Sequence, residues 1–251
     1  MASDFTKLPR LYIDRNFTAN ATVNLESAQT HYLKNVLRRK PGDFVRLFNG
    51  RDGEWLAELG EIKKRSAVLA VQTQTRPQTT GPDVDYLFAP LKRSRLDYMV
   101  QKAVEMGVAR LRPVLTHRTI AERINLDRMR ANAIEAAEQC GVLRVPEVLD
   151  PVGLDKALAT WGEPGQGERR TLVFCDEAAA AQSPLDTLAA LPHGPLAVLI
   201  GPEGGFDSVE REVLLAKPFV TAIWLGPRIM RADTAAVAAL TLVNATRGDW
   251  R

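Results

Sequence analysis

The pattern of apolar and polar positions divides the chain into two parts. Between residues 10 and 75, short runs of alternating apolar and polar residues predict β-strands, and NGRDG at 49–53 predicts a hairpin turn. One helical stretch, residues 27–37, interrupts these strands. A small, mostly β barrel is the simplest architecture for this part.

Beyond RPQTTGPD at 76–83, which lacks periodicity and predicts a linker, strands alternate with helices. The alternation predicts an α/β domain with a parallel sheet, and we place the two domains at 1–76 and 80–251. Segment 182–195 is expected to be a surface connection. The predicted strands lie within residues 84–91, 109–115, 171–177, 196–200 and 220–225, and the predicted helices within 95–107, 126–140 and 234–246.

The stretch LIGPEGGFDSVERE at 199–212 joins an apolar run to a helix through a glycine-rich turn. Five consecutive apolar residues, 196–200, are typical of a strand buried on both faces of a parallel sheet. Asp207 and Glu210 have capping-box spacing, so a helix is expected to begin near Ser208. Such a junction lies at the carboxyl end of a strand, where open α/β sheets bind ligands. The apolar positions expected to be buried are Val209, Val213 and Leu214.

A second junction of this kind is WLGPRIMRADTAAVAAL at 224–240, where an apolar strand runs into another Gly-Pro turn. Asp233 or Thr234 is expected to cap the helix that follows. If the two strands are neighbours, their loops flank one crevice, which indicates a ligand site better than either loop alone. The last helix is apolar on nearly all sides, which predicts burial against the sheet, another helix or a second subunit.

Positive charge is concentrated near the N-terminus. The net charge of the 251 residues is +3, yet residues 1–76 hold 13 lysines and arginines against 8 acidic residues. This asymmetry indicates contact with a polyanion, although a merely solvated basic face gives similar counts. No apolar run of about 18 residues and no signal-like N-terminus occur, so we expect a cytoplasmic protein without a membrane span.

Several familiar chemistries do not fit the sequence. GPEGGFDS lacks the Lys-Ser/Thr pair of a P-loop, and no GxGxxG opens a helix. Glu203 would repel a phosphate but suits a ligand that carries positive charge. The two cysteines have neither a CxxC motif nor a nearby histidine cluster, so neither a disulfide nor a metal site is expected.

Taken together, GPEGGF, LGPRIMRADTA and EAAEQCG resemble the 16S ribosomal RNA (uracil-N3) methyltransferase family of the SPOUT superfamily, and the resemblance spans nearly the whole chain. It implies a small PUA-like β barrel that binds RNA, followed by a SPOUT-type knotted α/β methyltransferase domain. In this family the trefoil knot holds S-adenosylmethionine, and members of the superfamily are homodimers. A true knot is a rare exception to the rules of chain connection, so local patterns do not predict it.

The resemblance also implies functional residues. Methylation at N3 of a flipped-out uridine requires its imidate to be favoured, and Arg231 is the first candidate for the stabilising cation. Candidates for orientation or proton transfer are Asp233, Glu138 and Arg144. The residues expected to bind the cofactor are Ile200, Gly201, Glu203, Gly204, Gly205, Leu225, Gly226, Ile229 and Met230. The residues expected to contact RNA phosphates are Lys34, Arg38, Arg39 and Lys40, with Lys92, Arg95 and Arg118 in the second domain.

The match to the family has departures, and other functions stay open. Val142 stands where the family usually has arginine, and Asp233 where it usually has glutamate. One alternative is a SPOUT methyltransferase of other specificity, such as 2′-O-ribose methylation. Another is a non-catalytic RNA-binding protein on the same scaffold, and a third is an α/β enzyme that uses a nucleotide.

Overall fold

The computed structural model describes residues 5–120, 123–162 and 170–250, and the chain divides into two compact units. The first unit comprises Met1–Thr80 together with Ala137–Val145. The second unit comprises Gly81–Ala136 and Pro146–Arg251. The inclusion of Ala137–Val145 in the first unit has no counterpart in the sequence pattern.

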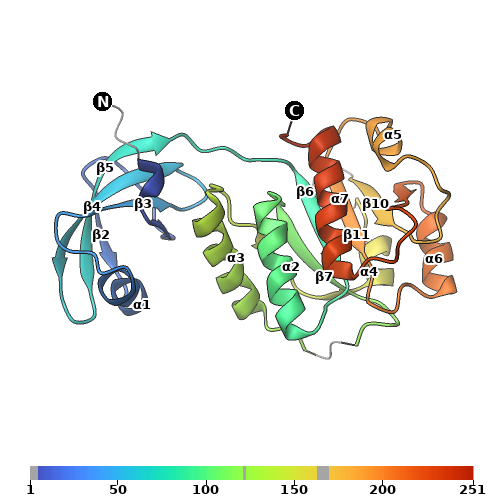
Figure 1. Ribbon diagram of the computed structural model, residues 1–251, viewed down its shortest axis with the longest axis horizontal. Coiled ribbons are helices and arrows are strands. Elements are labelled where there is room, and N and C mark those ends of the chain that lie inside the picture. Colours follow the sequence, from blue (N-terminus) through green and yellow to red (C-terminus); the bar gives the residue numbers. More distant parts are fainter. Residues whose placement is uncertain (1–4, 121–122, 163–169, 251) are drawn as a thin grey trace. The chain divides into compact units, whose positions relative to one another are not determined.

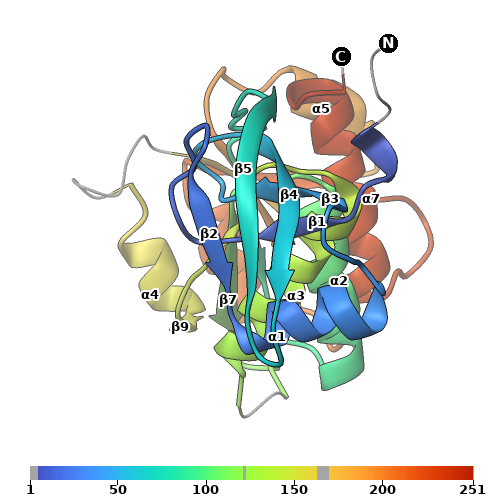
Figure 2. The ribbon, with the colours of Figure 1, turned by 90° about the vertical axis from the view of Figure 1, so that its left-hand side faces the viewer.

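The first unit is built on a five-stranded sheet with the order β1-β3-β4-β5-β2, which faces the viewer in Figure 2. β1 runs parallel to β3, and the other neighbours are antiparallel. The hairpin predicted around NGRDG is confirmed, because Phe48 pairs with Glu54 across it. Its strands are β1 Arg10–Tyr12, β2 Thr22–Leu25, β3 Phe44–Phe48, β4 Glu54–Ile62 and β5 Ala67–Arg76.

Strand β2 is missing from the sequence prediction because four residues give too short an alternation to recognise. The predicted helix at 27–37 is confirmed as α1, Ser27–His31, which continues into a π-helical segment, Tyr32–Val36. Glu26 and Gln29 form a capping box at its start. A short 3-10 turn, Phe5–Lys7, precedes β1. The core of the unit is apolar and includes Leu11, Val23, Leu33, Val45, Leu47, Leu59 and Leu69.

Arg10 is the central polar residue of the first unit, with only 3% of its side chain exposed. Its Nε donates to Glu54 Oε2 at 2.7 Å, and its guanidinium lies 4.3 Å from the centre of the Phe48 ring. The remaining donors reach the carbonyl oxygens of Ala137 at 2.6 Å and Val142 at 2.8 Å. Burial lowers the pKa of Arg10, and the charge of Glu54 opposes this effect. Arg10 therefore ties Ala137–Val145 to the sheet of the same unit.

The second unit contains a seven-stranded sheet with the order β12-β10-β11-β6-β7-β8, and β9 also pairs with β7 (Figure 1). All its pairings are parallel, as predicted. Consequently the carboxyl ends of these strands lie at one edge. The strands are β6 Val84–Phe88, β7 Arg110–Leu115, β8 Glu147–Val148, β9 Val152–Gly153, β10 Thr171–Cys175, β11 Leu196–Ile200 and β12 Val220–Ile223.

Helices cover both faces of this sheet. Successive side chains along its central strands point to opposite faces, and both sets are buried. Leu87, Phe174 and Leu199 pack with side chains of α4 and α6. On the other face, α7 contacts β11 and lies beside α2 (Figure 1). Tyr86 of β6 donates its hydroxyl hydrogen bond to Met99 of α2. The helices are α2 Arg93–Glu105, α3 Leu126–Cys140, α4 Leu154–Ala159, α5 Pro184–Ala189, α6 Ser208–Leu215 and α7 Ala232–Arg247.

Three details of the prediction are wrong. The segment 182–195 is not only a connection, since Ser183 caps α5 by accepting from Asp186 N, and the buried Leu188 anchors this helix. The last helix begins at Ala232 with Arg231 as its N-cap, not at Asp233 or Thr234. Asp233 instead lies in the first turn, where a carboxylate complements the helix dipole. The strand expected to reach Leu225 ends at Ile223.

The two strands that precede the Gly-Pro loops are not neighbours in the sheet, as the interpretation of a shared crevice had assumed. β11 and β12 are not adjacent, because β10 lies between them and pairs with both. Strand order depends on how crossover connections run over the sheet, which local sequence does not encode. Since the three strands are parallel, both loops still begin at the same edge of the sheet, with the end of β10 between them. None of the helices in the described part of the chain is long and apolar enough to cross a membrane.

Arg10→Ala should lower the free energy of unfolding of the first unit by about 2–4 kcal/mol, because Glu54 loses its shortest ion pair and the carbonyls of Ala137 and Val142 lose their donor. Glu54 keeps the longer contacts of Arg46 at 3.4 Å and Thr75 at 3.1 Å. Urea denaturation monitored by circular dichroism measures the change. Arg51→Ala is the matched control, since its ion pair with Asp14 is exposed and screened by solvent, so its loss should change stability little. Equal effects of the two substitutions would show that Arg10 has no special part in stability.

Candidate active site

The candidate site is the edge of the second unit where β10, β11 and β12 end. The first loop there, Gly201–Gly205, is a tight turn in which Gly205 N donates to the carbonyl of Pro202 at 2.9 Å. Gly205 has a φ of +69°, a left-handed conformation that favours glycine. This geometry keeps the chain compact immediately after the buried strand β11.

Gly201 is required for a different reason, namely close packing. A Cβ atom at this position would lie only 2.5 Å from the ring of Phe206. That ring makes an edge-to-face contact with Phe174 of β10, with 5.1 Å between the ring centroids. The missing side chain at Gly201 therefore lets Phe206 fold back against the sheet and fixes the direction of the loop. Gly204 has no such constraint, since a Cβ there would meet Arg118 at 3.6 Å.

Helix α6 begins as predicted, with Asp207 as its N-cap and a complete capping box to Glu210. The prediction that Val209 is buried is wrong, because 60% of this residue is exposed. Glu210 is buried in its place, and its Oε1 accepts a hydrogen bond from His117 N at 2.7 Å. Leu214 is buried and Val213 is half-buried against the same core. The capping residue, rather than apolar periodicity, thus sets which side of the first turn faces inward.

His117, in the loop after β7, also contacts the start of α6 through its ring. Its Nδ1 lies 2.6 Å from Asp207 Oδ2, and this hydrogen bond raises the pKa of His117. In the described part of the chain, His117, Asp207 and Glu210 form a cluster of the size that metal ligands adopt. Their oxygens, however, already accept hydrogen bonds within the cluster. The cluster therefore has a structural explanation, since its hydrogen bonds connect the loop after β7 to the start of α6.

The end of β10 supplies residues that the sequence analysis missed. Asp176 is buried and accepts from Arg211 of α6 at 3.0 Å, so it holds the loop after β10 beside the loop after β11. Glu177 follows, and a Cβ at Gly205 would lie 3.6 Å from its Oε1. Burial raises the pKa of the neighbouring Cys175 thiol to about 12. The sequence signal that could have identified Asp176 and Glu177 as site residues is their position directly after an apolar strand, in TLVFCDE.

The loop between β12 and α7 contains the second group of predicted cofactor residues. Leu225, Gly226 and Met230 are partly buried, and Gly226 has a φ of +106°. Ile229 is 90% exposed, which is unusual for a side chain of this size. Arg231 is exposed at the N-cap of α7, and Asp233 Oδ1 accepts locally from Thr234 N at 2.9 Å.

The basic residues predicted in the second unit have different surroundings. Arg95 forms an ion pair with Glu203 of the first loop, so the charge of Glu203 is already compensated in part. Arg118 donates to the carbonyl of Gly204 at 2.7 Å and supports the same loop. Lys92 is exposed at the N-cap of α2. Two of the three cations therefore contact the glycine-rich loop directly.

The remaining predicted residues belong to the first unit. Glu138 accepts from Tyr12 N through Oε1 at 2.8 Å, and its carbonyl accepts from Arg10. Arg144 is half-buried and belongs to Ala137–Val145, the segment that Arg10 ties to the sheet of this unit. Lys34, Arg38 and Lys40 are exposed, whereas Arg39 is partly buried.

Arg39 borders a cationic pocket within the first unit. The pocket has a volume of about 480 Å³ and is also lined by Lys7, Arg10, Arg46 and Glu138. The Nε atom of Arg39 is buried and has no hydrogen-bond partner among the described residues. A buried donor without a partner is costly, so an anion that reached this pocket would satisfy it.

Comparisons with known proteins agree with this architecture. The family model of the RNA methyltransferase domain matches residues 79–244, and that of the RNA methyltransferase PUA domain matches residues 25–72. These matches define the chain as an RNA methyltransferase with a PUA domain. The predicted fold class, a SPOUT-type α/β domain preceded by a small PUA-like β domain, is confirmed.

Relatives and solved structures narrow this class. The ribosomal RNA small subunit methyltransferase E of Rickettsia conorii is 30% identical over 239 residues, which cover 95% of this chain and 96% of that protein. The structure of the enzyme of this name from Neisseria gonorrhoeae, bound to S-adenosyl methionine, is 28% identical. It superimposes with a TM-score of 0.85 and covers 97% of this chain and 100% of that one. A putative methyltransferase from Legionella pneumophila, in complex with the bound cofactor SAM, has a TM-score of 0.84 at 27% identity, over 97% and 99% of the two chains. The chain belongs to the ribosomal RNA small subunit methyltransferase E family.

Gly201→Ala should lower the free energy of unfolding of the second unit by about 1–3 kcal/mol, because the added methyl group displaces Phe206 from the core. Thermal denaturation detects this as a lower Tm. Gly204→Ala, in the same loop, is the matched control and should cost less, since its Cβ meets only ordinary contacts. If both variants melt together, the packing of Phe206 does not explain the glycine at 201.

Proposed function

We propose that the protein is an S-adenosylmethionine-dependent methyltransferase that methylates N3 of a uridine in the 16S rRNA of the small ribosomal subunit. The observation that carries this proposal is the glycine-rich edge of a fully parallel sheet, in a chain that matches ribosomal RNA small subunit methyltransferase E proteins over its whole length. Two similar structures contain the bound methyl donor.

The residues at this edge fit such a cofactor. The turn at Gly201–Gly205 presents backbone polar groups beside a buried strand, and a side chain at Gly205 would be strained. Leu225, Ile229 and Met230 supply apolar surface for the adenosine. Ile200 is the last residue of β11, directly before the glycine-rich turn. Glu203, Gly204 and Gly226 complete the cofactor set. When bound, S-adenosylmethionine supplies an electrophilic methyl group.

The chemistry at uridine requires loss of the N3 proton. The N3–methyl bond would then form as the bond from the methyl carbon to the sulfonium sulfur breaks, and the donor would leave as a neutral thioether. N3 lies on the Watson-Crick edge, so the base must be unpaired or flipped out of its stack. We assign Arg231 to stabilise the negative charge that spreads onto O2 and O4, because its guanidinium is exposed where α7 begins. Fixed alignment and exclusion of water would supply much of the remaining rate acceleration.

The N3 proton needs an acceptor. Asp233 and Glu138 are candidates for this role or for orienting the base, whereas Arg144, as a guanidinium, can only orient it. Asp233 is two residues from Arg231 and lies in the first turn of α7. Glu138 and Arg144 come from the first unit, and the hydrogen bonds of Glu138 to Tyr12 favour an orienting role for it.

RNA binding is assigned to the first unit and to three cations of the second. Lys34, Arg38 and Lys40 are exposed, and Arg39 has a buried Nε without a partner in the described chain. Phosphate contacts from such side chains position RNA without reading its sequence. Lys92, Arg95 and Arg118 would extend the contact surface near the glycine-rich loop.

We further propose that the enzyme acts in the cytoplasm, where small ribosomal subunits assemble, and that it forms a homodimer. The sequence of α7 supports the second point, because a helix that is apolar on nearly all sides favours burial against another surface. The proposed reaction requires no metal.

The first experiment is calorimetric titration of the protein with S-adenosylmethionine, followed by reaction with 16S rRNA and mapping of the product by mass spectrometry. We expect binding and one new methyl group on N3 of a uridine. Methylation of a ribose oxygen would replace N3 specificity by 2′-O specificity, and absence of cofactor binding would leave an RNA-binding protein. Arg231→Ala should lower the single-turnover rate at saturating RNA while the cofactor still binds.

The double substitution Arg38→Glu and Arg39→Glu should weaken RNA binding and reduce the slope of its salt dependence, because fewer phosphate counterions are released. Fluorescence anisotropy with labelled rRNA at several salt concentrations measures the slope. Lys63→Glu with Lys64→Glu makes the same change of charge elsewhere in the unit and serves as control. Equal slopes for the parent protein and the first variant would contradict a phosphate contact at Arg38 and Arg39.

A further inference from the structure

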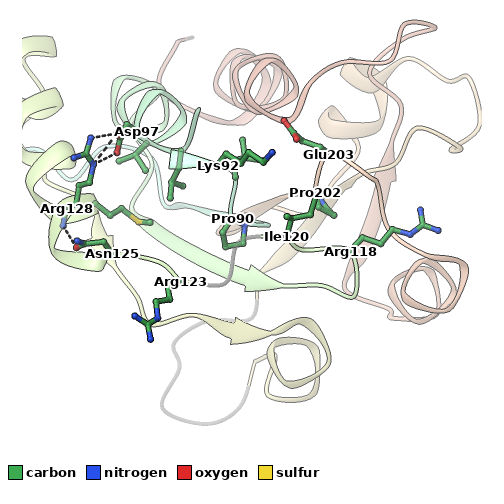
Figure 3. Close-up of a pocket in the computed structure, with 14 residues that line it drawn as sticks. Pro90, Lys92, Asp97, Arg118, Ile120, Arg123, Asn125, Arg128, Pro202 and Glu203 are labelled. Carbon is green, nitrogen blue, oxygen red and sulfur yellow. Dashed lines mark hydrogen bonds and ion pairs between the residues drawn. The ribbon is translucent and has the colours of Figure 1, made fainter. Parts of the chain in front are cut away.

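A pocket in the second unit lies on the other side of the glycine-rich loop from the ends of β10 and β12. Its lining comes from the segments that follow β6, β7 and β11, which are neighbours in the sheet. Pro202 and Glu203 of the glycine-rich loop form part of its wall, so the loop adjoins both this pocket and the proposed cofactor site. Figure 3 shows Pro202 and Pro90 at the centre of the view, between the labelled charged side chains.

The pocket has a volume of about 500 Å³, which is within the range of sites for small molecules. Its interior is apolar and comes mainly from α2 and α3. A base can pack on such a surface, because aliphatic side chains contact either face of a flat ring. The apolar residues are Leu91, Leu96, Val100, Ile120 and Met129.

Charged groups surround this interior, and cations outnumber carboxylates among them. On one side Arg128 binds Asp97 through two nitrogens, with Nε 3.0 Å from Oδ1 (Figure 3). On the other side Glu203 is paired with Arg95. Because both carboxylates of the lining have an arginine partner, the remaining charge is positive. Lys92 is exposed at the rim and has no ion pair among the described residues.

These features match one nucleotide of an RNA chain better than a free apolar ligand. An apolar interior suits the base, whereas a cationic rim suits the phosphate that follows it along the backbone. The shared wall at Pro202 and Glu203 places this receptor next to the loop proposed to hold the methyl donor. A methyl acceptor must lie beside the donor for transfer to occur.

We infer that this pocket receives the target uridine after it has left its stack, with the base against Leu96 and Ile120 and a phosphate at Lys92. The inference rests on the proposed function and names the place of the acceptor. It separates two tasks, since most of the general RNA affinity is assigned to the first unit, while this pocket, with Lys92 at its rim, selects and retains a single nucleotide. Filling the pocket should therefore block transfer without abolishing RNA or cofactor binding.

The test uses Leu96→Trp, which fills the pocket from α2, and Tyr98→Trp on the same helix as control, because Tyr98 is exposed and does not line the pocket. The probe is a 16S rRNA fragment that the parent protein methylates, with 2-aminopurine beside the target uridine. Its fluorescence rises when the uridine is extruded from the stack. For Leu96→Trp we expect loss of this rise and at least a tenfold slower single turnover. Cofactor affinity and overall RNA affinity should stay within about threefold of the parent values, as should all values for Tyr98→Trp.

A folded Leu96→Trp variant that extrudes and methylates the uridine like the parent overturns the inference. If Leu96→Trp loses cofactor binding, Lys92→Glu decides, since that exposed side chain can be reversed in charge without disturbing the core. At RNA concentrations that saturate binding, a parental fluorescence rise and rate in Lys92→Glu would then overturn the inference, and their loss would support it. Failure of the parent protein itself to bind the cofactor or methylate rRNA would instead contradict the proposed function.

Discussion

The parallel direction of every strand pair in the second unit is the constraint on which its function depends. Parallel strands all begin at one edge of the sheet and end at the other. The loops that follow them therefore lie at the same edge, even where they are far apart in the sequence. Three such segments lie at the carboxyl edge of the sheet: the turn at Gly201–Gly205, the acidic pair after β10 and the loop before α7. Their positions are then fixed by particular contacts, above all Phe206 packed over Gly201 and Asp176 bonded to Arg211.

The first unit is organised by a different force. Its sheet is small, and its stability depends on one buried cation as well as on an apolar core. Arg10 pairs with Glu54 and donates to the carbonyls of Ala137 and Glu138 in the last turn of α3, where helix carbonyls have no partners within the helix. The segment that contains Glu138 and Arg144 therefore owes its place to a residue near the N-terminus.

Local features of the fold could be predicted from the sequence, while those set by distant contacts could not. The strand at 196–200 and the capping box of α6 follow from neighbouring residues alone, and both are confirmed. The position of β10 between β11 and β12 depends on crossover connections, and the burial of Glu210 instead of Val209 depends on His117, more than 90 positions away. The roles of the predicted site residues remain predictions, because they concern chemistry that geometry alone does not test.

Cys175 has a consequence for the durability of the enzyme. It ends β10 at the same edge as the glycine-rich loop, and a thiolate there would compete with RNA for an electrophilic methyl group. Burial raises the pKa of this thiol to about 12, so the neutral and poorly nucleophilic form prevails at neutral pH. A cysteine kept in its neutral form competes poorly for a methyl donor bound at this edge of the sheet.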